Sequence, residues 1–195
     1  MNHLDAIDVG LDAHTPYHEI ARKVYLTYPT KAFVGDEERQ YEILNEISQF
    51  FRIPITCVQV AGSAKTGRSF HKGTDFTLGE SDLDVAIIDA GLYIHYTEIV
   101  LSAAKGYSDR SGFPIKNGRS TFNEYTEYLA KGLFRPDLMC TGQARAEWMA
   151  FFGKLSARHG EIFKSISAAI YLSQAFFENK QRSAVKNYAD MKVEK

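Results

Sequence analysis

The stretch from residue 55 to residue 88, ITCVQVAGSAKTGRSFHKGTDFTLGESDLDVAII, decides which fold this chain can adopt. It begins with Ile55 to Val60, a β-branched and mostly apolar run that predicts a buried strand. An Ala-Gly-Ser turn follows at residues 61–63, and then a polar, glycine-containing segment. A second apolar run, Leu83 to Ile88, predicts another strand. Two such strands joined through a turn and a polar loop indicate the centre of a small sheet.

Two aspartates lie at the start of the second strand. Asp82 and Asp84 are two residues apart, so both carboxylates project from the same face of an extended chain. Carboxylates held side by side repel each other, and a divalent cation between them relieves that repulsion. Mg²⁺ (or Mn²⁺) is the candidate, because Mg²⁺ takes hard oxygen ligands and shares them with substrate phosphates. The alternative is a surface strand end with two solvated acids.

The Gly62-Ser63 turn gives the acid pair a context. Glycine lets a ligand come close to the backbone, and free N–H groups with a serine hydroxyl can hold phosphate oxygens. Positive side chains follow nearby in the polar loop. The pattern of strand, Gly-Ser turn, basic loop and Asp-x-Asp strand predicts a nucleotide site. Its expected residues are Gly62, Ser63, Lys65 and Arg68 for the nucleotide, and Asp82 and Asp84 for the metal.

Ala61-Gly62-Ser63 with Gly67, followed by Ser81-Asp82-Leu83-Asp84-Val85, resembles the polymerase-β-like nucleotidyltransferase superfamily in its minimal, stand-alone type. The resemblance covers about residues 36–88. It implies a Gly-Ser turn that binds the triphosphate and two aspartates that hold metal ions. It also implies transfer of a nucleoside monophosphate from a nucleoside triphosphate to a hydroxyl acceptor. The acceptor stays open between an RNA end, a protein and a small molecule, and a protein partner stays open as well.

The superfamily takes a third carboxylate from a neighbouring strand, and this sequence does not show an obvious one. Asp137 is the first candidate and would complete the catalytic set, although Pro136 argues against a central strand there. Asp89 and Glu98 are weaker candidates. Without a third acid, the alternative function is a catalytically impaired protein of the same fold that binds a nucleotide or a partner. A purely structural subunit with its aromatic helices as the binding face is a further alternative.

The rest of the chain predicts helices around this sheet, and the first dozen residues are expected to be loosely held. The predicted fold is α+β, with a small mixed β-sheet covered by helices, nucleotidyltransferase-like, and a helical C-terminal part. Its predicted units are a catalytic core over residues 1–140 and a helical extension packed on it over residues 141–195. Apolar spacing places the helices at residues 16–28, 36–51, 91–105, 121–133, from 141 onward, and 162–177.

Composition and charge exclude several other classes. No apolar run approaches the roughly 20 residues of a membrane span, so no membrane association is expected. A formal net charge of −1 gives no general attraction to nucleic acid. Cys57 and Cys140 are the two cysteines, too few for a disulfide framework or a four-ligand zinc site. A cytoplasmic location is the expectation.

Overall fold

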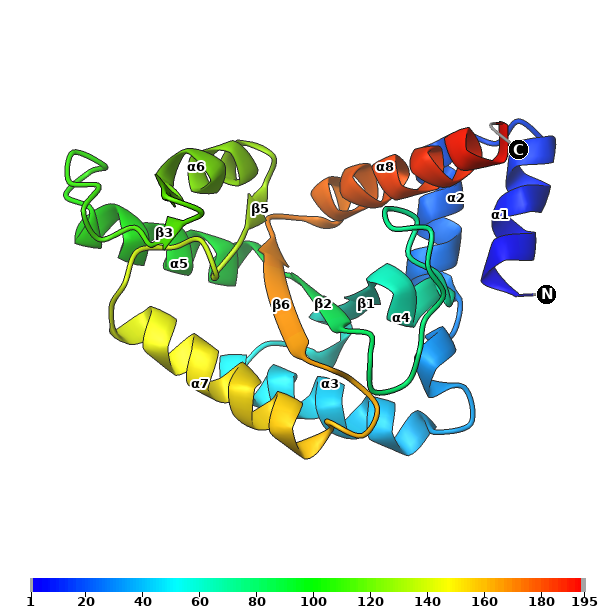
Figure 1. Cartoon of the computed structure of the whole chain (residues 1–195), viewed down its shortest axis with the longest axis horizontal. Coiled ribbons are helices and arrows are strands. Elements are labelled where there is room, and N and C mark those ends of the chain that lie inside the picture. The colour runs from blue at the N-terminus through cyan, green and yellow to red at the C-terminus, as the bar shows by residue number, and fades with distance from the viewer. Residues whose placement is uncertain (1, 194–195) are drawn as a thin grey trace.

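A four-stranded sheet lies at the centre of the computed structural model, which describes residues 2–193 (Figure 1). Its order is β1-β2-β6-β5. The β1–β2 and β5–β6 pairs are antiparallel and the β2–β6 pair is parallel, so the sheet is mixed. The expected α+β class, with a small mixed sheet covered by helices, is confirmed. The strands are β1 (Val58–Ala61), β2 (Leu83–Ile88), β5 (Leu133–Phe134) and β6 (Ile166–Tyr171).

One face of the sheet carries the larger hydrophobic core. Val60, Val85 and Ile166 project from that face and are almost fully buried. They belong to the same apolar cluster as side chains from three helices, which cover this face. These helices are α3 (Glu37–Phe51), α5 (Ala90–Ala103) and α7 (Gln143–Arg158).

The opposite face carries a smaller core, built with helices from both ends of the chain. Phe177 is fully buried here, and its ring meets the rings of Tyr25 and Tyr171 edge-on, with centroids 6.2 and 5.2 Å away. Figure 1 shows α8 lying beside α2. The helices of this layer are α1 (His3–Asp12), α2 (Tyr17–Arg22), its π-helical continuation Lys23–Thr27, and α8 (Gln174–Val193).

Shorter elements connect these layers. None of the helices in the described range 2–193 is long and apolar enough to cross a membrane. The expected strand at residues 55–60 starts later, because its first three residues form a 3₁₀ turn. The short elements are that turn (Ile55–Cys57), a second 3₁₀ turn (Lys31–Phe33), α4 (Gly62–Thr66), α6 (Phe122–Ala130), β3 (Ile115–Lys116) and β4 (Arg119–Ser120).

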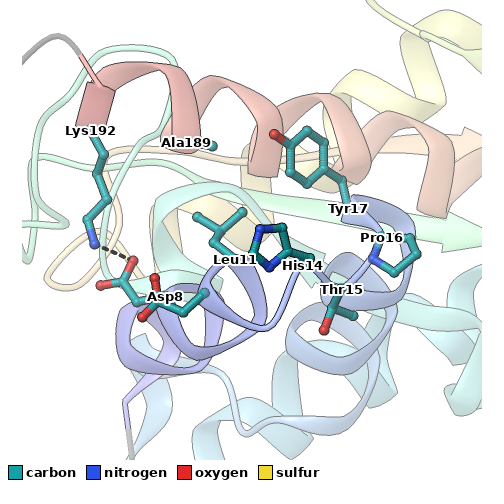
Figure 2. Close-up of a pocket in the computed structure, with 9 residues that line it drawn as sticks. Asp8, Leu11, His14, Thr15, Pro16, Tyr17, Ala189 and Lys192 are labelled. Carbon is teal, nitrogen blue, oxygen red and sulfur yellow. Dashed lines mark ion pairs between the residues drawn. The ribbon is translucent and has the colours of Figure 1, made fainter.

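Two ion pairs join the first helices to the last one, and the pair between Asp8 and Lys192 lies beside a cavity of about 600 Å³ (Figure 2). Nζ of Lys192 in α8 lies 2.6 Å from Oδ1 of Asp8 in α1. Arg22 of α2 and Glu178 of α8 are 2.8 Å apart, and this pairing satisfies a carboxylate that is otherwise buried. The expectation of a loosely held N-terminal end is therefore wrong, because these residues form a docked helix.

The helix predicted over residues 162–177 is also wrong. Residues 166–171 form β6, and α8 begins only at Gln174. Ile166 and Ile170 are four residues apart, which places them on one face of a helix but also on one face of a strand. The spacing therefore agreed with both structures, and pairing with β2 selects the strand.

The C-terminal part of the chain is more than a helical extension. β6 lies between β2 and β5, so residues 141–195 contribute a central strand to the sheet. A boundary at residue 140 does not separate the sheet from a set of helices. Residues 1, 194 and 195, which belong to the two predicted units, lie outside the described residues.

Candidate functional site

The register of the sheet places Asp84 at the centre of the site. Ala61 in β1 and Ser167 in β6 both lie opposite Asp84. Residues opposite each other in neighbouring strands project from the same face, so Asp84 stands between the end of β1 and the start of β6. Asp82 immediately precedes β2, and its Oδ1 accepts a hydrogen bond from Ser165 Oγ at 2.7 Å. The two acids are therefore held on one sheet face, as the sequence predicts.

Gly62 allows the turn after β1 to lie against Asp84. Its φ of +64° is in the left-handed region, which favours glycine. A Cβ atom at residue 62 would overlap Oδ2 of Asp84. Both the backbone conformation and the close approach of the carboxylate therefore favour glycine here, because any side chain would displace the carboxylate of Asp84 from its present position.

Asp82 and Asp84 line a cavity of about 930 Å³ together with Gly62 and Ser63. Cationic side chains from three separate segments face the same space. Such a cavity, with an acidic pair and a cationic wall, matches a polyanion that binds together with a metal ion. The cationic residues are Arg68, Lys72, Lys164 and Lys180.

Arg68 also organises the polar loop that forms one wall of the cavity. Its guanidinium contacts Asp75 Oδ1 at 2.5 Å and donates to the carbonyl of Gly73 at 2.6 Å. The loop therefore closes on itself through Arg68. Lys72, at the tip of this loop, also lines the cavity and opposes the charge of Asp84.

The pKa of Asp84 is raised above that of an ordinary aspartate. The first cause is burial among protein atoms, although solvent in the cavity still reaches the side chain, and the second is the negative charge of Asp82. Lys72 and Arg135 act in the opposite direction. The raised pKa means that ionisation of Asp84 beside Asp82 is unfavourable. A bound cation would offset this, because it would stabilise both carboxylates in their charged forms.

Lys65 does not join the predicted nucleotide residues. Its side chain is only 4% exposed, and its Nζ donates to the carbonyl of Tyr28 at 2.6 Å. It therefore joins α4 to the segment that follows the π-helix, away from the cavity. Of the predicted nucleotide residues, the structure brings Gly62, Ser63 and Arg68 to the acid pair.

The buried position of Lys65 predicts a pH dependence of stability. Burial lowers the pKa of Lys65 from 10.5 to about 8. Between these values the unfolded chain binds more protons than the folded one, so the free energy of unfolding rises with pH across that window. Below pH 8 the folded protein bears the full free-energy cost of burying a charged Lys65. A lowered pKa of this size corresponds to up to about 3 kcal/mol. The wild type should therefore gain stability relative to Lys65→Met between pH 7 and 10, as measured by urea unfolding. Parallel stability curves for the two proteins would contradict it.

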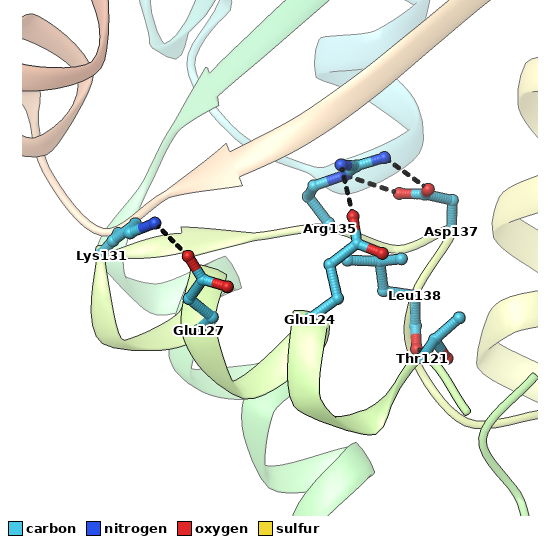
Figure 3. Close-up of polar contacts among 7 residues, drawn as sticks. All are labelled: Thr121, Glu124, Glu127, Lys131, Arg135, Asp137 and Leu138. Carbon is cyan, nitrogen blue, oxygen red and sulfur yellow. Dashed lines mark hydrogen bonds and ion pairs between the residues drawn. The ribbon is translucent and has the colours of Figure 1, made fainter. Parts of the chain in front are cut away.

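Asp137, the first candidate for the third carboxylate, is held by an arginine (Figure 3). Arg135 contacts both of its carboxylate oxygens, with Nε 3.0 Å from Oδ1 and Nη2 2.6 Å from Oδ2. Arg135 also lies 3.4 Å from Glu124. Asp137 lines a second cavity that Asp84 lines as well, so it is near the acid pair but engaged elsewhere.

The two weaker candidates lie in other settings. Asp89 caps α5, because its Oδ1 accepts a hydrogen bond from the Leu92 N–H at 2.7 Å. Glu98 is exposed on the same helix and lines neither cavity that contains Asp84. Beside β2, the strand β6 offers Ser167 at the position opposite Asp84. Within residues 2–193, no three metal-ligating side chains gather into one group.

The residues present fit a metal that arrives with its substrate. Mg²⁺ is commonly bound through one or two carboxylates and completes its coordination with phosphates and water. Asp82 and Asp84 supply such a pair beside a cationic wall. Among residues 2–193 no third carboxylate joins them, and Asp137 is paired with Arg135.

Sequence reasoning missed the contribution of β6 to the site. The apolar spacing of residues 162–177 predicts a helix, so the sequence gives no reason to place Lys164, Ser165 or Ser167 beside the acid pair. A weak signal was present: Ile166 to Tyr171 is a short run of mainly apolar residues, and that length is as typical of a buried strand as of a helix.

No protein-family model matches the sequence, and comparison with curated proteins and with solved structures finds no match either. The resemblance to the polymerase-β-like superfamily rests on the sequence motif.

Proposed function

We propose that this chain is a metal-dependent nucleotidyltransferase, which moves a nucleoside monophosphate from a nucleoside triphosphate to a hydroxyl acceptor. One observation carries the proposal: the chain at Gly62 lies so close to Asp84 that a Cβ atom at residue 62 would overlap Oδ2 of that carboxylate. Gly62, Ser63 and the acid pair line a single cavity with Lys72, Lys164 and Lys180, and this supports a site in which the Gly-Ser segment would hold phosphate.

Each group has a role in this proposal. Asp82 and Asp84 would hold Mg²⁺ or Mn²⁺. When bound, the metal stabilises charge on the transferring phosphate as a Lewis acid. Ser63 and the N–H groups of its turn orient the terminal phosphates, and the lysines neutralise their charge. Catalysis is then mainly positioning and electrostatic stabilisation.

The transfer step has a simple balance. The acceptor hydroxyl oxygen forms a bond to the α-phosphorus, and the bond between that phosphorus and the α–β bridging oxygen breaks. Pyrophosphate leaves with the bonding electrons, and the hydroxyl proton passes to solvent. The step uses no oxidant or reductant.

Nucleotide binding without transfer is the second candidate function. Two features favour it: Ser167 stands opposite Asp84 in β6, and Asp137 is occupied by Arg135. A protein of this kind would keep the cavity and the metal but lack an acid beside the attacking hydroxyl.

The experiment is incubation of the purified chain with each α-³²P-labelled nucleoside triphosphate, Mg²⁺ or Mn²⁺, total RNA and cell lysate. Transfer is expected to place label on RNA, on a protein or on a small molecule, which gel electrophoresis and thin-layer chromatography separate. Binding of nucleotide without transfer supports the second candidate. A folded protein that binds no nucleoside triphosphate contradicts both.

A further inference from the structure

Strand β6 has one stretch of free edge, and it faces the second cavity beside Asp84. This cavity has a volume of about 670 Å³ and shares Gly62 and Asp84 with the first one. Its lining includes Ala168 of β6 and an apolar wall from α7, formed by Trp148, Met149 and Phe152. The shared residues place it next to the cavity proposed to hold the phosphates.

The hydrogen-bonding pattern of β6 identifies which backbone groups face this cavity. In a strand, the N–H and C=O of alternate residues point to opposite sides. The Ile166 N–H points away from β2, because it donates to Ser156 Oγ of α7 at 2.8 Å. The Leu172 N–H also points away from β2, because it donates to the carbonyl of Gly132 at 3.0 Å, and by alternation the backbone groups of Ile170 point the same way, toward β5. By the same alternation, the N–H and C=O of Ala168 point to this side.

On this side of β6 the backbone groups of Ile166 and Ile170 are covered by other parts of the protein, whereas the backbone groups of Ala168 face the cavity. Ser156 occupies the position beside Ile166, and β5 occupies the position beside Ile170. Continuation of the β5–β6 register would put Pro136 opposite Ala168. Proline has no N–H to donate, and β5 ends at Phe134. Among the described residues, no strand pairs with Ala168 on this side.

Because the free edge of β6 is one residue long, it suits a small planar ligand. A peptide strand would need several consecutive free positions, and only one is available here. One N–H and one C=O beside an apolar wall match a flat group that carries an acceptor next to a donor. Every nucleobase has such an edge, and this cavity joins the proposed phosphate site at Asp84 and Gly62.

We infer that the second cavity binds the base of the nucleotide, with the backbone N–H and C=O of Ala168 pairing with the hydrogen-bonding edge of the base. The inference rests on the proposed nucleotide site. It gives the base a position between α7 and α8, and it assigns Pro136 the role of keeping the edge of β6 free.

The test compares ligands with and without a base by isothermal titration calorimetry in Mg²⁺. The probes are inorganic tripolyphosphate and ATP, CTP, GTP and UTP. At least one nucleotide should bind ten or more times tighter than tripolyphosphate. Ala168→Pro removes the free N–H while leaving the β2 ladder intact, because this N–H points away from β2. It should weaken the preferred nucleotide about tenfold and leave tripolyphosphate unchanged. Ala168→Gly keeps the N–H and is the matched control.

An analogue provides a readout in the wild type, in case the proline variant does not fold. N-methylation that blocks the hydrogen-bonding edge, as in N6,N6-dimethyl-ATP when ATP is preferred, should cause a similar loss. Equal affinity of tripolyphosphate and all nucleotides, or full retention of affinity in Ala168→Pro and with the analogue, would overturn the base site alone. Failure of every probe, tripolyphosphate included, would overturn the proposed function and the base site together.

Discussion

Asp84→Asn is expected to lower nucleotidyl transfer about 10³-fold while the protein still folds. Asparagine keeps the shape of the side chain but loses the charge that would hold a metal, and several kcal/mol of transition-state stabilisation depend on that metal. Transfer of label from an α-³²P nucleoside triphosphate is the measurement. Urea unfolding of the same preparation reports on folding.

The pKa of Asp84 predicts that stability will not fall in this variant. Burial and the charge of Asp82 raise this pKa, so the folded state binds more protons than the unfolded state just above the ordinary value of 3.8. Stability from this group therefore decreases as pH rises through that window, and the ionised form carries a penalty at pH 7. Asparagine removes the penalty, so the unfolding free energy should be unchanged or higher.

Glu80→Gln is the matched control for Asp84→Asn. Glu80 lines the same cavity, and its substitution by glutamine removes the same charge. It lies in the loop before β2 and does not belong to the acid pair. Its transfer rate should stay within a few-fold of the wild type. Equal losses in the two variants would mean that only the net charge of the cavity matters. A large loss of stability in Asp84→Asn would instead identify the carboxylate as structural.

The second large effect is expected for Gly62→Ala. A Cβ at this position would overlap Oδ2 of Asp84, and the carboxylate can relieve the overlap only by rotating away. Cγ and Cβ of Asp84 would lie 3.3 and 3.4 Å from the new methyl group, so these two atoms can keep their positions. Transfer should fall at least about 10²-fold, because small displacements of a positioning group have effects of that size.

Gly106→Ala separates backbone strain from the contact with Asp84. Gly106 has a φ of +68°, close to the +64° of Gly62, and an added Cβ would meet no atom within 4 Å. Both alanine variants should lose about 1–2 kcal/mol of stability from the left-handed backbone. Only Gly62→Ala should lose transfer. Similar transfer rates in the two variants would show that the close approach of Gly62 to Asp84 has no role.

The local parts of this molecule were predictable, and the long-range ones were not. The β-branched run before Gly62, the turn itself and the alternation of Asp82 and Asp84 all belong to one stretch of sequence. Pro136 also acted as predicted, because β5 ends before it. Each of these inferences depends on the backbone chemistry of neighbouring residues.

The third strand of the site depends on information that a short window does not contain. Ile166 and Ile170 suit a helix face and a strand face equally, and only the pairing of β6 with β2 distinguishes them. The bond between Arg135 and Asp137 is another case. The two residues are close in sequence, but the bend after β5 decides that their side chains meet. The depth of Lys65 likewise follows from the N-terminal segment packed over it.

The parallel pairing of β2 with β6 has a consequence for how the protein is made. Ser165 and Asp82, which share a hydrogen bond, are 83 residues apart, and Lys180 arrives later still from α8. During translation both acids leave the ribosome well before the strand and the helix that enclose them. For that interval the nascent chain has the acid pair without the cavity. The site therefore comes into existence only after β6 and α8 have been synthesised.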